Sequence, residues 1–211
     1  IYAGGTFTDA GGTTDADYLA KWNPTSETWE SVIAGINGTV LCMAFDANGD
    51  LYIGGTFTDL GSAAGDRIVK ITDLSGTPTI NVLGTGLNSD CLTIAIAPNG
   101  DVYAGGAFTL AGGVAGTVRI AKWDGTSWSP LSTGLNSMVL TLGISYGGVL
   151  YIGGAFTDIS YPYLCYWDGS AFQMVGEVAM TGEVYTIKFD DMGKLIAGGS
   201  FTSAGNIPDA D

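Results

Sequence analysis

The feature that most constrains the fold of this chain is a phrase that returns along its whole length. Five segments contain the letters GGxFT, where x is Thr, Ala or Ser. Their longer forms are IYAGGTFT at residue 1, LYIGGTFT at 51, VYAGGAFT at 102, LYIGGAFT at 150 and LIAGGSFT at 195, so the copies are 50, 51, 48 and 45 residues apart. A nearly constant period of this length indicates a repeat architecture, either a solenoid or a propeller.

Each repeat contains four short segments with the composition of β-strands. An apolar run such as CLTIAIA comes first, and a turn such as APNGD leads from it into the GG phrase. A loop rich in Gly, Asp and Ser then leads to a third segment such as RIAKWDG, and a fourth such as SWSPLST completes the unit. Asn-Gly and Asp-Gly between apolar runs are strong hairpin signals, and no segment shows a sustained helical period. We therefore predict an all-β fold, a β-propeller of four-stranded antiparallel blades with a period of about 45–51 residues.

The repeat also predicts the domain organisation. The blade units are residues 1–38, 39–88, 89–137 and 138–182, followed by a partial unit of 183–211. The final phrase stops at Asp211, which is equivalent to Asp17 in the first phrase. We expect one propeller domain or a fragment of one, cut from a longer protein whose further repeats extend the ring or array. The alternative is a four-bladed ring in which 184–189 completes the first blade.

The paired glycines need a physical reason, because glycine inside a strand normally weakens a sheet. Their recurrence predicts a close approach of a neighbouring blade or an aromatic ring at this point. Aromatic residues flank the pair, and we expect them to supply the packing between blades. They are Tyr2, Tyr52, Tyr103 and Tyr151 before it, and Phe7, Phe57, Phe108, Phe156 and Phe201 after it.

Composition excludes some partners. The chain has 21 acidic and 7 basic residues, no histidine and a net charge of −14. Such a surface repels phosphate backbones and anionic lipid, so we expect no nucleic-acid binding. The sequence holds no run of 18 apolar residues, so we expect no membrane insertion either. The composition is compatible with cations, with neutral sugars and with solubility outside a cell.

The three cysteines have neither metal-ligand nor disulfide spacing. Cys42 stands where other units have Thr93, Thr141 and Thr186. Cys91 stands where they have Val40, Val139 and Val184, and Cys165 where they have Ala20, Val69 and Ala121. Because all three replace small residues at core positions, we predict buried structural thiols.

Acidic and basic residues recur at fixed places. The loops after the GG phrase share one face of a propeller, and their acids are candidates for a weak divalent-cation site, with Ca²⁺ as the ion: Asp9, Asp15, Asp17, Asp59, Asp66 and Asp158. The alternative is that these side chains are simply solvated, and we predict no other cofactor. Five of the basic residues lie in the third segments, where we expect outward side chains paired with acids: Lys21, Lys70, Lys122, Arg67 and Arg119.

Aromatic residues offer two candidate binding features. Tryptophans end the third segment or begin the fourth, where they either pack across the hairpin or stack on sugars; they are Trp22, Trp29, Trp123, Trp128 and Trp167. The fourth unit has a shorter loop, DISYPY, with a tyrosine in place of the lysine of other units. Its tyrosines Tyr161, Tyr163 and Tyr166 are the predicted binding residues, with solvated strand positions as the alternative.

The unit resembles a kelch-type propeller blade. Its fuller phrase, YxGGxFT with IAKWDGxxW and LxTGLN, resembles a Gly-rich propeller repeat of bacterial secreted and surface proteins, phage tail proteins and fungal cortical markers. The resemblance covers the whole chain and implies a propeller fold in a secreted, cell-surface or virion protein. Kelch-like propellers include copper oxidases, but these need histidine ligands and the activity does not carry over to a chain without histidine.

We therefore expect a non-enzymatic binding or structural module that contacts a protein or glycan on a surface. One alternative is a glycoside hydrolase or lyase that uses a carboxylate pair in the central funnel. Its candidates are Glu177 and Glu183, which are less repeated than the other acids but flank a loop with no partner motif. The other alternative is an assembly module, because unpaired strand edges favour self-association.

Overall fold

Strands follow one another along the chain as antiparallel hairpins and form one sheet for each repeat. The computed structural model describes all residues except 59, 61–65, 158–161, 177–178, 205–206 and 209–211. The predicted fold class, all-β with four-stranded antiparallel blades, is confirmed. No helix in the described part of the chain is long and apolar enough to cross a membrane.

Five sheets, numbered here in chain order, contain most of the strands. Sheet 1 consists of β1 (Tyr2–Gly4), β2 (Leu19–Asn23) and β3 (Thr28–Ser31), with a 3₁₀ turn, η1 (Ala10–Gly12), after β1. Sheet 2 consists of β4 (Val40–Phe45), β5 (Leu51–Gly55), β6 (Ile68–Thr72) and β7 (Thr79–Val82). Sheet 3 consists of β8 (Cys91–Ile96), β9 (Val102–Gly106), β10 (Ile120–Trp123) and β11 (Trp128–Pro130). Sheet 4 consists of β12 (Val139–Ile144), β13 (Leu150–Gly154), β14 (Leu164–Trp167) and β15 (Phe172–Met174). Sheet 5 consists of β16 (Val184–Phe189) and β17 (Leu195–Gly199), and a separate pair is made by β18 (Ser203–Ala204) and β19 (Ile207–Pro208).

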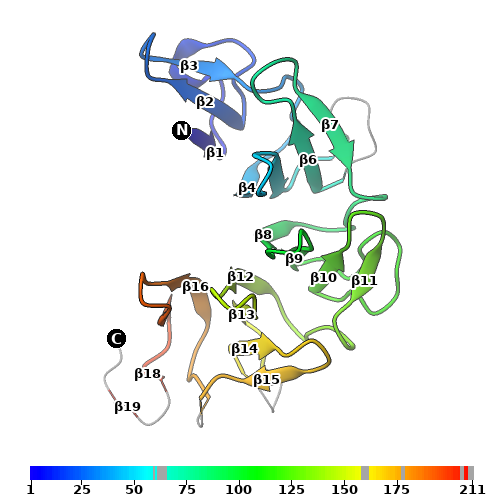
Figure 1. Ribbon diagram of the computed structural model, residues 1–211, viewed down its shortest axis with the longest axis vertical. Helices are drawn as coiled ribbons and strands as arrows, with labels where there is room; N and C mark the ends of the chain where they lie inside the picture. Colours follow the sequence, from blue (N-terminus) through cyan, green and yellow to red (C-terminus); the bar gives the residue numbers. More distant parts are fainter. Residues whose placement is uncertain (59, 61–65, 158–161, 177–178, 205–206, 209–211) are drawn as a thin grey trace.

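The sheets stand side by side along an open arc (Figure 1). Their first strands β4, β8, β12 and β16 lie toward the inside of the arc and contact one another in that order. The N-terminus lies at the open side. Neighbouring sheets pack face to face, as propeller blades do.

The paired glycines lie where neighbouring sheets come closest. A Cβ on Gly105 would stand 2.5 Å from Cγ1 of Val139 in the next sheet, and Gly4 and Gly153 meet Val40 and Val184 in the same way at 2.7 Å. In sheets 2 to 5 the second glycine of the pair faces a backbone carbonyl at the start of its own sheet, such as that of Asp90 beside Gly106. The predicted close approach is confirmed. The first glycine leaves space for a side chain of the neighbouring sheet, and the second leaves space for the bulged first strand of its own sheet.

The aromatic residues beside the glycines pack in opposite directions. Phe57, Phe108 and Phe156 are fully buried, and Phe108 shares a cluster with Leu83 and Leu87 of the preceding repeat. Tyr52 joins that same cluster from sheet 2, where it meets side chains of sheet 3. The predicted packing between blades is therefore confirmed for these residues.

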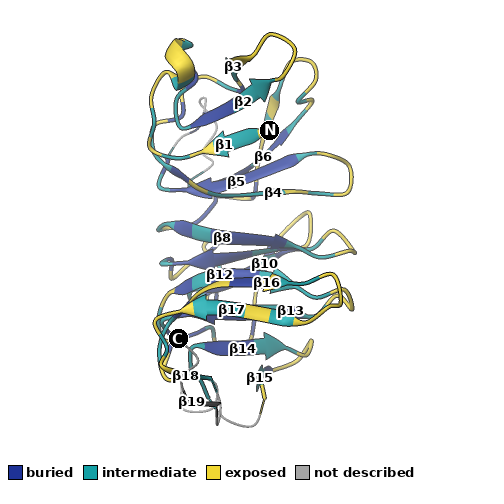
Figure 2. Cartoon of the chain, turned by 90° about the vertical axis from the view of Figure 1, so that its left-hand side faces the viewer, coloured by how far each residue is buried: buried dark blue, intermediate teal, exposed yellow. Residues whose placement is uncertain are grey.

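Burial is deepest in the second strands of sheets 2 to 4, which are β5, β9 and β13. β5 is buried along its length, whereas Leu41 and Phe45 of β4 are 44% and 49% exposed. The first strand borders the open inside of the arc, so some of its apolar side chains remain in contact with solvent. β17 occupies the position of β5 in sheet 5 and carries exposed residues (Figure 2).

The tryptophans pack across the outer hairpins, as one of the two interpretations predicted. Trp22 and Trp29 are paired across β2 and β3 with ring centroids 5.4 Å apart, and Trp123 and Trp128 repeat this at 5.5 Å. Trp167 pairs in the same way with Phe172 at 5.0 Å. Edge-to-face and tilted pairs of this kind stabilise the outer strands of each sheet.

Candidate functional site

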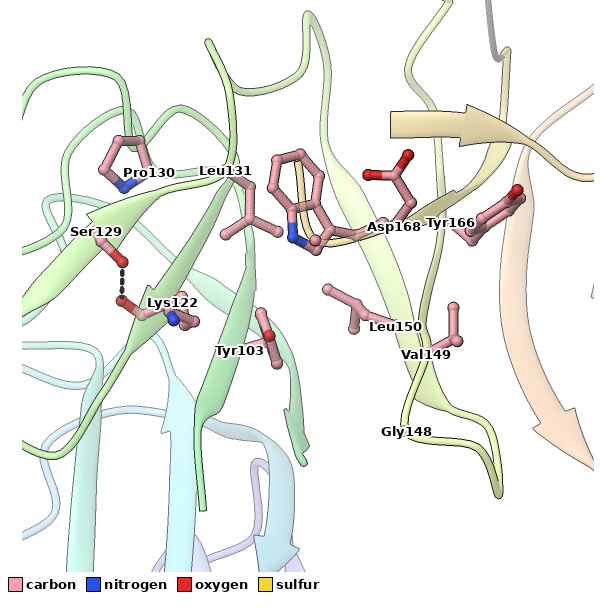
Figure 3. Close-up of a pocket in the computed structure, with 12 residues that line it drawn as sticks. Tyr103, Lys122, Ser129, Pro130, Leu131, Gly148, Val149, Leu150, Tyr166 and Asp168 are labelled. Carbon is pink, nitrogen blue, oxygen red and sulfur yellow. Dashed lines mark hydrogen bonds between the residues drawn. The ribbon is translucent and has the colours of Figure 1, made fainter. Parts of the chain in front are cut away.

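A groove between sheets 3 and 4 is the candidate site (Figure 3). It encloses about 570 Å³, a volume within the usual range for small-ligand sites. One wall comes from β9, β10 and β11, and the other from the turn before β13 and the end of β14. The lining residues are Tyr103, Lys122, Ser129, Pro130, Leu131, Gly148, Val149, Leu150, Tyr166, Trp167, Asp168 and Gly169.

Strand alternation places the side chains of the first wall. Tyr103 and Lys122 are directly paired across β9 and β10, so their side chains share the face that looks toward sheet 4. Leu150 and Trp167 are paired across β13 and β14 in the same manner. Figure 3 shows Tyr103 and Lys122 on one side of the groove, with Leu150 and Asp168 on the other.

Charge of both signs borders the groove. Lys122 Nζ lies 3.3 Å from Oδ2 of Asp101, which holds the ammonium group on the sheet 3 side. Burial, reinforced by the nearby Asp101 carboxylate, raises the pKa of the Tyr103 phenol, so this group stays a neutral hydrogen-bond donor. Ser129 Oγ donates to the Lys122 carbonyl at 3.4 Å, which orients one wall (Figure 3).

Asp168 supplies a carboxylate at the opposite rim. The backbone N–H groups of Ala171 and Ser170 each donate to its Oδ1 at 2.8 Å, and Gln173 Nε2 donates to Oδ2 at 2.8 Å. Those hydrogen bonds, the one from Ala171 first, hold the pKa of Asp168 well below its usual range. The groove therefore keeps a fixed negative charge at any pH near neutrality.

The combination of groups defines the chemistry of the groove. Tyr103, Trp167 and Leu150 present apolar surface, while Lys122 and Asp168 present a donor and an acceptor. Rings beside a few polar groups fit a neutral polar ligand with one apolar face, such as a sugar. Asp168 is the one carboxylate among the described residues that line it, whereas hydrolysis of a glycoside needs two.

An equivalent groove between sheets 1 and 2 is smaller. It encloses about 190 Å³ and is lined on the same wall by Tyr2 and Lys21. Glu30 is the cross-strand partner of Lys21, while the smaller Ser129 is the partner of Lys122. The shorter side chain at this position contributes to the larger volume of the groove between sheets 3 and 4.

Two of the three predicted binding tyrosines, Tyr163 and Tyr166, lie among the described residues and have separate surroundings. Tyr166 lines the groove, but its ring packs against Tyr151 at 5.7 Å, and Tyr151 packs against Phe189 of sheet 5 at 5.3 Å. Tyr163 packs against the buried cluster of Leu164, Val184 and Ile187, with a left-handed backbone at φ 67°. Tyr161 lies outside the described residues.

The described acids among those proposed for a cation site, Asp9, Asp15, Asp17 and Asp66, lie in loops with hydrogen bonds of their own. Oδ1 of Asp17 accepts from the Asp9 N–H at 2.7 Å, and the Asp15 carbonyl accepts from Ser31 Oγ at 2.7 Å. The Asp66 carbonyl accepts from the Leu87 N–H at 3.0 Å. Asp59 and Asp158 lie outside the described residues, and among those described no group of three or more potential metal ligands forms.

The predicted pairing of basic residues with acids is confirmed at three positions. Lys70 Nζ lies 3.0 Å from Asp46 and 2.8 Å from Asp50, and Lys122 pairs with Asp101 as described above. Arg67 Nη1 lies 2.7 Å from Asp90. Among the described residues no acid lies within ion-pair distance of Lys21 or Arg119, so the predicted pairing holds at three of the five positions.

Sequence reasoning missed the groove itself and a repeated asparagine. Oδ1 of Asn88 accepts from the N–H groups of Thr109 and Leu110, and Asn37 and Asn136 make the same bond to the threonine of the GGxFT phrase. In each case the two residues are 21 positions apart. The constant spacing between the asparagine and the phrase is the signal that could have revealed this connection.

Comparison with known proteins gives a family model and similar folds. Residues 1–142 match the model described as the Rax2 C-terminal beta propeller domain. A comparison with curated proteins found no match.

Among solved structures, PorZ, a surface component of the type-IX secretion system of Porphyromonas gingivalis, has a TM-score of 0.58 at 16% identity, covering 92% of this chain and 29% of that one. Virginiamycin B lyase from Staphylococcus aureus has a TM-score of 0.54 at 14% identity, covering 85% and 55%. A gluconolactonase from Xanthomonas campestris has 0.57 at 13%, covering 87% and 62%. The chain thus spans less than two thirds of each of these proteins, and identities this low establish a shared propeller fold alone.

Proposed function

The chain belongs to the family of the Rax2 C-terminal beta propeller domain, and we propose that it is a non-enzymatic binding module of a secreted, cell-surface or virion-tail protein. The observation that carries this proposal is the groove between sheets 3 and 4, with its aromatic walls, one ammonium group and one carboxylate. The likeness to the PorZ surface component supports a surface location.

Neutral glycans are the ligand class that fits the groove best. The rings of Tyr103 and Trp167 provide faces for the C–H side of a sugar, and Asp168 accepts from its hydroxyl groups. The net charge of −14 opposes anionic ligands at long range. A neutral oligosaccharide avoids this repulsion and needs no metal.

The Asp168→Asn substitution is expected to weaken binding of a neutral oligosaccharide selected from a glycan array by about tenfold, because a charge-assisted hydrogen bond becomes a neutral one. Isothermal titration calorimetry measures the loss. The matched control is Asp124→Asn, since Asp124 makes the same turn hydrogen bonds in sheet 3 without lining the groove. Equal affinities for the two variants would contradict a glycan site at this place.

The enzyme alternative predicts a different result from the same material. Glu177 lies outside the described residues, and the Glu183 carbonyl accepts from the Ser200 N–H at 2.9 Å. Incubation of the selected oligosaccharide with the protein should leave it intact by mass spectrometry. Turnover that one carboxylate substitution abolishes would replace the binding proposal with the enzyme one.

Self-association is a second candidate function, favoured by the exposed face of sheet 5. Its Ile196 is 56% exposed, whereas Tyr52 at the equivalent position of sheet 2 is 7% exposed and packs against sheet 3. Exposed apolar residues beside strand edges favour contact with a second copy.

If this face mediates self-association, the Ile196→Asp substitution should reduce the dimer fraction at least tenfold in sedimentation experiments across a concentration series. Met192→Asp is the control, because Met192 is 77% exposed in the turn before β17. A wild-type chain that stays monomeric at high concentration would remove this candidate and leave the glycan proposal untouched.

A further inference from the structure

The first strands of sheets 2 and 3 bring two cysteines together. Cys42 of β4 and Cys91 of β8 are 49 positions apart in the chain, and their sulfur atoms lie 3.9 Å apart. Cys42 is half-buried and Cys91 is fully buried. The spacing in the sequence gave no sign of this pair, because each cysteine belongs to a different repeat.

The other interfaces show what normally occupies these positions. Thr93 Oγ1 accepts from the Leu142 N–H of the next sheet at 3.0 Å, and Thr141 Oγ1 accepts from the Ile187 N–H at 3.1 Å. Each hydroxyl therefore links one first strand to the next. Between sheets 2 and 3 the threonine is replaced by Cys42, whose thiol is a weaker hydrogen-bonding group.

The valine of the other interfaces is also replaced at this one. Val139 and Val184 fill the space beside Gly105 and Gly153, and Cys91 fills the matching space beside Gly54. A Cβ on Gly54 would stand 2.6 Å from the sulfur of Cys91 and 2.7 Å from that of Cys42. The threonine and the valine of the other interfaces are thus replaced here by the two cysteines that touch each other. Gly54 lies beside both and has no side chain to separate them.

We propose that Cys42 and Cys91 form a dithiol site that closes to a disulfide between sheets 2 and 3 on exposure to a low-molecular-weight disulfide such as oxidised glutathione. This proposal does not rest on the proposed function. The sulfur atoms need to approach by about 2 Å to reach bonding distance, a movement that side-chain rotation and a small strand shift can supply.

The reaction proceeds by two thiol–disulfide exchanges. The thiolate of the half-buried Cys42 attacks one sulfur of the reagent, whose S–S bond breaks and releases one thiolate. The thiolate of Cys91 then attacks the Cys42 sulfur of the mixed disulfide and releases the second. The two protein thiols lose two electrons and two protons, and the reagent is reduced to two thiols.

The rate of thiol oxidation determines the design of the experiment. The hydrogen bond with the Cys91 thiol, followed by burial, raises the pKa of Cys42 and leaves little thiolate at neutral pH. Oxidation of the folded chain is therefore expected to be slow. Refolding the unfolded chain in a glutathione redox buffer removes the access barrier and tests the equilibrium.

The experiment follows the thiols of the full chain after refolding in reduced and oxidised glutathione. Alkylation and peptide mapping by mass spectrometry should show Cys42 joined to Cys91 and Cys165 alkylated. The melting temperature of this form should rise on the order of 5–10 °C and return to the starting value after reduction.

Two variants separate the disulfide from general effects of refolding. Cys42→Thr restores the residue of the other interfaces, so this chain should fold and show no temperature shift in the same buffer. Cys165→Val, which introduces the residue of the second repeat, should keep the full shift. Recovery of all three thiols, a stable glutathione adduct, or a bond to Cys165 in the refolded wild type would overturn the proposal.

Discussion

Replacement of Trp128 by alanine is expected to lower the free energy of unfolding by about 3–5 kcal/mol. The indole is 5% exposed and packs on Trp123 across the outer hairpin of sheet 3. Its Nε1 donates to the Leu83 carbonyl of the preceding repeat at 2.7 Å, so the substitution also leaves a buried acceptor without its partner. Equilibrium unfolding in urea, followed by circular dichroism and tryptophan fluorescence, measures the loss.

Two further variants separate the parts of this effect. Trp128→Phe keeps an apolar ring but removes the N–H donor, so about 1–3 kcal/mol of the loss should remain. Trp29→Ala changes the equivalent but half-buried tryptophan of sheet 1, which pairs with Trp22, and should cost about half as much as Trp128→Ala. If the two alanine variants lose equal stability, the indole of Trp128 does not fasten sheet 3 to sheet 2.

Repetition made the fold predictable from sequence. The recurring GGxFT phrase revealed the second strand, and the comparison of units showed which residues share a position. It also explained the glycines correctly, since Gly105 does approach Val139 of the next sheet. Repeats allow this because each unit meets the same neighbours, so a local pattern carries information about contacts between units.

The candidate groove was not predictable in the same way. Tyr103 and Lys122 recur in other units, and their recurrence favoured a structural interpretation. Their role in the groove depends on Trp167 and Asp168 of the following sheet, and on the small Ser129 beside Lys122. A site formed by residues of two units becomes visible only in a structure that places the two sheets next to each other.

The predicted tyrosine site shows a second reason why the groove was harder to predict from sequence than the fold. Tyr166 occupies the position of Lys122 one unit later, and a residue at this position faces the next sheet rather than the preceding one. Its ring therefore packs on Tyr151 toward sheet 5, although the residue also lines the groove, whereas the neighbouring Trp167 packs toward sheet 3. The aromatic composition was evident from the sequence, but the direction required the strand pairing.

The cysteines follow the same logic. Comparison of units assigned each cysteine correctly to the position of a small residue, and Cys91 and Cys165 are buried as predicted. The comparison could not show that Cys42 of one repeat touches Cys91 of the next repeat. The sulfur contact of 3.9 Å is a property of the interface and not of either repeat.

Replacement of Gly105 by alanine is expected to lower the free energy of unfolding by about 1–3 kcal/mol. The sign is informative, because alanine in a strand is normally more stable than glycine by about 0.5–1 kcal/mol. Here the added Cβ would lie 2.5 Å from Cγ1 of Val139 and 2.8 Å from Cγ2 of Thr93. Both neighbours are buried, so relief of the contact requires a shift of sheet 4 against sheet 3.

The matched control is Gly198→Ala at the equivalent position of sheet 5. Among the described residues, Cγ2 of Thr186 at 3.0 Å is the one atom within 4 Å of the added Cβ, and Thr186 is exposed and free to turn away. We expect this variant to be neutral or slightly stabilised in the same urea titration. A loss of stability as large as that of Gly105→Ala would mean that the first glycine of the pair is required by its own strand and not by the neighbouring sheet. A loss confined to Gly105→Ala would mean that the repeat retains this glycine for the sheet that packs against it.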